Sequence, residues 1–117
     1  MSEEEIREFV RRFYAALDAG DAETASALFP DGTRIHLWDG RTFTTQAEFR
    51  EWFVKLYSES DDARREVVSL EVDGDRALVR VVLRASYKGE ERVVELRHEF
   101  LFEGDELVEV RVEIRPL

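Results

Sequence analysis

The second half of the chain contains four successive segments in which apolar and charged residues alternate. They cover about residues 63–72, 76–87, 91–102 and 106–115, and a glycine-containing turn dipeptide separates each from the next. Side chains of a strand alternate between the two faces of a sheet, so these segments predict four long antiparallel strands. One face of that sheet would be charged and wet, and the other apolar and in need of a cover.

The first half supplies that cover, because its pattern is helical. Ser2 and Thr45 each stand three residues before a glutamate, which forms a capping box ahead of apolar residues at helical spacing. We expect the first helix to end at Gly20 and a short second helix to occupy Asp21–Phe29, where proline stops it. The third helix follows Thr45.

A short hairpin is predicted between the second and third helices, with Arg34–Trp38 and Arg41–Phe43 as strands around an Asp-Gly turn. The whole chain, residues 1–117, is then one α+β domain with three helices packed on a curved antiparallel six-stranded sheet. This order of elements resembles the nuclear transport factor two-like cone fold. The resemblance implies a central pocket between the concave sheet face and the helices.

Composition excludes several classes of function. Acidic residues outnumber basic ones 27 to 17, so the net charge of −10 argues against binding nucleic acid or an anionic membrane. The chain has no cysteine, no signal-like N-terminus and no apolar run long enough to span a bilayer. We therefore expect a cytoplasmic protein. The charged outer sheet face favours a monomer, although natural members of this fold often pair through that face.

His98 lies on the apolar face of the third long strand, beside Leu96 and Phe100. A buried imidazole requires a hydrogen-bond partner, because leaving it unpaired costs on the order of a few kcal/mol. Such a histidine is more often a satisfied core residue than a catalyst. His36 stands alone in its strand and is expected to face outward or pack on a helix. The two histidines make no convincing metal site without a third inward ligand.

Three further polar residues are predicted to point towards His98. Tyr14 and Asp18 lie four residues apart on one face of the first helix. A carboxylate is unfavourable at a helix C-terminus, so Asp18 needs another reason for its position. Arg65 would supply one if it faces inward, through a bidentate ion pair. Each residue alone is usually structural, but four such groups converging on one apolar concavity indicate a site.

Several sequence strings give a closer resemblance, over the full length, to the de novo designed luciferases, which oxidise synthetic imidazopyrazinone (coelenterazine-type) luciferins. The strings are Arg11–Tyr14, Ile35–Gly40, Phe49–Phe53, Ser69–Val72 and Glu109–Val112. Consistent with a designed origin, local propensity, hydrophobic pattern and turn chemistry agree throughout the chain.

The resemblance implies roles for individual residues. The Tyr–His dyad of the family falls on Tyr14 and His98, and its Asp–Arg dyad falls on Asp18 and Arg65. The family pattern has an arginine where this chain has Ser60. The smaller serine should widen the pocket mouth and remove a direct contact to the luciferin anion. The residues expected to bind substrate are Phe13, Leu17, Leu56, Ser60, Val81, Leu83, Leu96, Val110 and Val112.

The implied reaction needs molecular oxygen as co-substrate and no metal or organic cofactor. The luciferin loses a proton, and its anion reacts with oxygen to form a dioxetanone that expels carbon dioxide and leaves an excited amide. His98, oriented by Tyr14, would accept or donate the proton, since imidazole titrates near neutrality. Arg65, held by Asp18, would be the electrostatic partner.

Two other functions remain open. The same scaffold could bind an apolar small molecule without turnover, in which case ligand binding saturates but yields no oxygen-dependent product. Proton-transfer isomerisation, as in ketosteroid isomerases, requires an inward carboxylate base beside a tyrosine. Only Tyr14 clearly fits that requirement if Asp18 pairs with Arg65.

Overall fold

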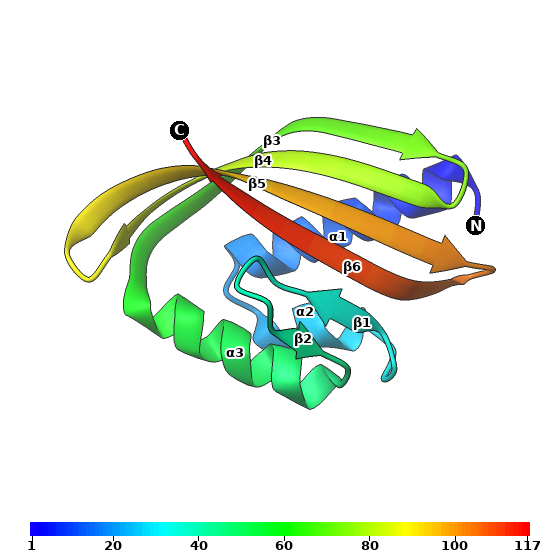
Figure 1. The fold of residues 1–117 in the computed structure, drawn as a ribbon, viewed down its shortest axis with the longest axis horizontal. Helices are drawn as coiled ribbons and strands as arrows, with labels where there is room; N and C mark the ends of the chain where they lie inside the picture. Colours follow the sequence, from blue (N-terminus) through cyan, green and yellow to red (C-terminus); the bar gives the residue numbers. More distant parts are fainter.

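The computed structural model describes residues 1–117, apart from the side chain of Asp61. Three helices and six strands make up the chain (Figure 1). In order they are α1 (Glu3–Asp18), α2 (Ala22–Ala27), β1 (Arg34–His36), β2 (Thr42–Phe43), α3 (Gln46–Glu59), β3 (Ser60–Asp73), β4 (Arg76–Tyr87), β5 (Glu90–Glu103) and β6 (Glu106–Pro116). The predicted α+β fold, with helices against a curved six-stranded sheet, is confirmed.

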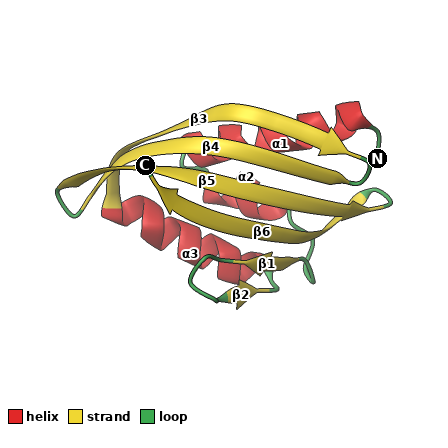
Figure 2. Ribbon diagram, turned by 45° about the horizontal axis from the view of Figure 1, so that its top comes forward, coloured by secondary structure: helices red, strands yellow, loops and turns green.

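The sheet has the strand order β2-β1-β6-β5-β4-β3, and the helices lie on its concave side (Figure 2). The four long strands form the predicted antiparallel meander. The sheet is not antiparallel throughout, however, because β1 runs parallel to β6. Alternation along a strand does not encode its direction relative to a neighbour distant in sequence. That direction depends on the path of the chain between β1 and β6, which includes β2, α3 and the three other long strands.

The first predicted capping box is complete, whereas the second is half formed, because the Glu48 carboxylate accepts from the Thr44 N–H and not from the Thr45 N–H. The Ser2 hydroxyl accepts from the backbone N–H of Glu5 at 3.1 Å, and the Ser2 N–H donates to the Glu5 carboxylate at 3.0 Å. Thr45 accepts from the Glu48 N–H at 3.2 Å. Among the described helices, none combines the length and apolar character needed to cross a bilayer.

Three register shifts interrupt the long strands and add curvature to the sheet, the first of them between Asp61 and Arg64 in β3. The other two lie between Val67 and Ser69 in β3, and where Leu101 and Phe102 of β5 meet β6. A bulge places one extra residue in a strand, which bends it and moves the following side chains to the opposite faces. These bends curve the long strands over α1, where Phe100 is completely buried.

Gly20 joins α1 to α2 and provides a stability test. Its φ is +68°, and an added Cβ would lie 2.4 Å from the ring of Tyr57 on α3. Gly74 has a similar φ of +60° but nothing within 4 Å. We expect Gly74→Ala to cost about 1–2 kcal/mol in the free energy of unfolding, and Gly20→Ala to cost slightly more, because the half-exposed Tyr57 ring has to turn aside. Urea unfolding measures both, and equal losses would contradict a role for the Tyr57 contact.

Candidate functional site

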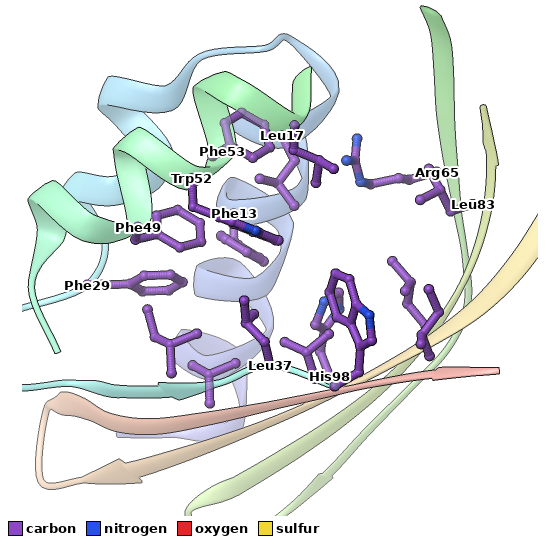
Figure 3. A pocket seen from close by; sticks show the side chains of 17 residues that line it. Phe13, Leu17, Phe29, Leu37, Phe49, Trp52, Phe53, Arg65, Leu83 and His98 are labelled. Atoms are coloured by element: carbon purple, nitrogen blue, oxygen red, sulfur yellow. The ribbon is translucent and has the colours of Figure 1, made fainter. Parts of the chain in front are cut away.

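A cavity of about 170 Å³ lies between the concave face of the sheet and the helices α1 and α3 (Figure 3). Apart from the indole nitrogens of two tryptophans, its polar side chains are those of Arg65 and His98. Its other walls are aromatic and aliphatic. The lining residues are Phe13, Leu17, Phe29, Ile35, Leu37, Trp38, Phe49, Trp52, Phe53, Leu56, Arg65, Leu83, Leu96, His98, Val110, Val112 and Ile114.

His98 projects into this cavity from the middle of β5, between Val79 of β4 and Val112 of β6. Its Nδ1 is hydrogen-bonded to the hydroxyl of Tyr14 on α1. Both side chains are buried, with exposed fractions of 6% for His98 and 4% for Tyr14. The Phe13 ring lies edge-on to the imidazole at 6.2 Å between centroids. The imidazole is therefore fixed in orientation by one hydrogen bond and by aromatic packing.

Burial determines the protonation of this pair. Loss of hydration, helped by the nearby positive charge of Arg65, lowers the pKa of His98 to about 3. Burial also raises the pKa of the Tyr14 hydroxyl well above its usual value. At neutral pH the phenol keeps its proton and the imidazole is neutral. We therefore assign the Tyr14 hydroxyl as donor to Nδ1, which leaves Nε2 carrying its hydrogen as a donor for a ligand.

This low pKa predicts a specific loss of stability in acid. An unfolded histidine binds its proton near pH 6.5, whereas folded His98 binds it only near pH 3. The contribution of neutral His98 is therefore fully present above about pH 6.5 and is lost as the pH falls towards about 3. We expect the free energy of unfolding to fall more steeply from about pH 7 to pH 4 in the parent than in His98→Phe. Parallel curves from urea unfolding would contradict the buried neutral state.

Arg65 enters the cavity from β3, opposite Leu83 of β4. Its side chain is 8% exposed, whereas that of Asp18 is 47% exposed. Among the described side chains, its ion pair is with Asp18, through one contact of 3.5 Å between Nη1 and Oδ1. The predicted pairing of the two residues is present, but it is a single long contact and not a bidentate one. The guanidinium is thus a buried cation whose charge the half-exposed carboxylate compensates only partly.

The other predicted contact residues divide into two groups. Seven of them line the cavity, namely Phe13, Leu17, Leu56, Leu83, Leu96, Val110 and Val112. Ser60 and Val81 do not. Ser60 donates its hydroxyl to the Leu56 carbonyl at 3.1 Å and so completes the end of α3. Val81 is fully buried in the core of the sheet, where its neighbours fill the space in front of it.

Sequence reasoning missed the aromatic wall that α3 and the β1–β2 turn contribute. Phe49, Trp52 and Phe53 share the apolar stripe of α3 with Leu56, so the helical spacing that identified the helix could also have placed them at the pocket. Trp38, by contrast, lies in a turn where no periodicity operates. It reaches the cavity only because β1 joins the sheet beside β6.

His36 takes no part in the cavity. It is partly exposed, its Nδ1 lies 3.1 Å from the Thr42 hydroxyl, and its Nε2 lies 3.7 Å from the Glu109 carboxylate. Within the described part of the chain, no three His, Asp or Glu side chains come together as a metal site would require.

Solved structures with the same arrangement of helices and sheet include an NTF2-like protein from Burkholderia thailandensis E264. It is 18% identical, has a TM-score of 0.82, and the match covers 92% of this chain and 88% of that one. For an LEH-like epoxide hydrolase from M. tuberculosis the identity is 13%, the TM-score 0.78, and the coverage 94% and 82%. A de novo designed protein with a curved β-sheet is 25% identical, with a TM-score of 0.75 and coverage of 99% and 89%.

No curated protein matches the chain in sequence. The SnoaL-like domain model does match, over residues 10–110. That stretch contains the cavity walls from α1 to Val110 and both polar residues that face the cavity. The chain therefore belongs to the SnoaL-like domain family, with the NTF2-like fold of three helices on a curved sheet.

Proposed function

We propose that the protein is a designed luciferase, which oxidises a synthetic imidazopyrazinone luciferin with molecular oxygen and emits light. One observation carries the proposal: an aromatic cavity whose side-chain polar groups, besides two indoles, are one oriented neutral imidazole and one buried guanidinium. Such a cavity suits a flat, mostly apolar molecule that develops negative charge on one edge.

The proposed reaction uses each of these groups. The luciferin loses one proton to solvent and becomes an anion. The His98 Nε2–H and the Arg65 guanidinium stabilise that anion, because buried donors act strongly where water is excluded. Addition of oxygen gives a dioxetanone, which loses carbon dioxide and leaves the excited amide anion. The low pKa of His98 favours hydrogen-bond donation to the anion over proton abstraction by its ring.

The aromatic walls have a second task in this scheme. They exclude water from the excited product, which would otherwise quench its emission. The rings of Phe13 on α1, Phe29 after α2 and Phe49 on α3 pack against one another behind the ligand space, and Phe29 and Phe49 meet edge to face at 4.8 Å between centroids. This packing restrains the walls without any polar atom that would carry water into the cavity.

A binding scaffold without turnover is the alternative, since the same cavity can hold an apolar ligand. Isomerisation of the ketosteroid type is disfavoured, because no carboxylate lines the cavity in the described residues and Asp18 is half exposed.

The experiment compares light from the purified protein and an imidazopyrazinone luciferin in aerated and in oxygen-depleted buffer. We expect emission far above free luciferin in air and none without oxygen. Saturable binding with no emission in air would contradict the luciferase and leave the binding scaffold. The same purified protein can be used to measure the preferred analogue and the emission colour. It can also be used to measure the oligomeric state, for which we propose a monomer.

A further inference from the structure

The cavity is partly open to solvent and is small for the proposed ligand, so a ligand of that size has to pass, and remain in contact with, the residues at its mouth. Its volume of about 170 Å³ is close to that of an engineered cavity of about 150 Å³ that accepts benzene. An imidazopyrazinone with aryl substituents contains several ring systems. This inference rests on the proposed function, because it concerns how a ligand of that class enters the same site.

The residues at the mouth are the exposed ones of the lining. Most of the lining is buried or partly buried, but Trp38 is 43% exposed and Ile114 is 36% exposed. Ile114 belongs to β6 and is paired with Leu96 of β5, so the sheet holds its backbone. Trp38 lies outside regular secondary structure, between β1 and β2. It is the largest side chain at the cavity mouth.

The turn that carries Trp38 is itself well held. The Leu37 N–H donates to the Arg41 carbonyl at 2.9 Å. The Asp39 carboxylate accepts from the Arg41 backbone N–H at 3.0 Å and from its Nε at 2.8 Å. These bonds fix the backbone on both sides of Trp38. A change at the mouth is therefore a rotation of the Trp38 side chain and not a movement of the hairpin.

The partner of Trp38 is more firmly held than Trp38 itself. Its indole meets that of Trp52 edge to face, at 6.1 Å between centroids. Trp52 in turn contacts Phe43 at 5.9 Å and Phe49 at 6.1 Å. This contact joins the half-exposed ring of Trp38, in a turn, to the ring of Trp52, which belongs to α3 and is held by its aromatic neighbours. One aromatic contact of this kind is weak enough to open thermally.

We propose that the Trp38 indole is the entry and specificity residue of the cavity. It closes the mouth against Trp52, rotates outward to admit an aryl-substituted ligand, and then packs on the ligand edge that remains at the mouth. It thereby sets the rates of entry and exit and limits the bulk of the substituent at that end.

The test follows binding of an imidazopyrazinone luciferin by stopped-flow tryptophan fluorescence in oxygen-depleted buffer, where turnover cannot interfere. In Trp38→Ala we expect association and dissociation to accelerate by up to about tenfold each, the change that corresponds to loss of one aromatic contact. Trp52 remains as the reporter. Trp38→Phe should fall between parent and alanine variant, and Val54→Ala, at an exposed position of α3, should match the parent.

The outcomes separate this proposal from the luciferase proposal. Faster rates in Trp38→Ala, with no light when oxygen is admitted to the parent, would support the entry role and contradict the luciferase. Unchanged rates together with strong emission would overturn the entry role alone. Unchanged rates with a lower free energy of unfolding would reduce Trp38 to a packing residue. Absence of saturable binding to the parent would overturn both proposals.

Discussion

Replacing His98 with alanine is expected to reduce light emission from imidazopyrazinone luciferin by about 100-fold or more, the range seen when an oriented donor or general acid is removed. The variant loses the Nε2–H that faces the cavity, while the apolar walls remain. Luciferin should still bind, so the loss falls on kcat and not mainly on KM. Initial emission rates over a series of luciferin concentrations measure both values.

A folding defect has to be separated from this effect, because His98→Ala leaves the buried Tyr14 hydroxyl without its partner. An unpaired buried donor costs about 1–3 kcal/mol of stability. The double variant Tyr14→Phe with His98→Ala removes both polar groups, and we expect it to recover stability but not emission. His36→Ala, which changes the other histidine outside the cavity, should emit like the parent. Emission from His98→Ala equal to that of the parent would rule out the proposed role.

Local signals in the sequence predicted the elements correctly because each depends on neighbouring residues alone. The Ser2 and Thr45 caps fixed two helix starts, and period-two alternation placed His98 on the inner face of β5. The same alternation could not foresee the bulge after Val67, since an extra residue in one strand leaves no mark on the pattern before it. The predicted strand Arg34–Trp38 ends at His36, because the Leu37 N–H bonds to the Arg41 carbonyl and starts the turn.

The predicted contact residues that do not line the cavity differ from the others in their depth in the structure. Val81 shares the inward face with Leu83, yet only Leu83 reaches the cavity, because Val81 is covered completely by the core. Ser60 follows α3 too closely to reach the ligand space. Trp38 could not be found at all, since its position depends on the parallel pairing of β1 with β6. Alternation distinguishes the two faces of a strand but not the distance of a residue from the centre of the cavity.

Replacing Arg65 with methionine, which keeps much of the side-chain length, should also lower emission by about 100-fold, as loss of a buried donor to a developing oxyanion does. Arg64→Met is the matched control. Arg64 is exposed and lies opposite Arg84 of β4 in the strand register, away from the cavity. We therefore expect Arg64→Met to emit like the parent. Both variants change the net charge equally, which removes long-range electrostatics as an explanation of any difference.

Replacing Asp18 tests whether Arg65 acts alone in the proposed reaction or needs its ion pair with Asp18. Its contact with Arg65 is long, at 3.5 Å, and its carboxylate is 47% exposed. An ion pair of this kind contributes about 0–1 kcal/mol, and the guanidinium stays charged without it. We therefore expect Asp18→Ala to lower emission by no more than about fivefold. A loss as large as that of Arg65→Met would show that the carboxylate is required to hold the guanidinium in place. In that case the two residues would act as one unit despite their long contact.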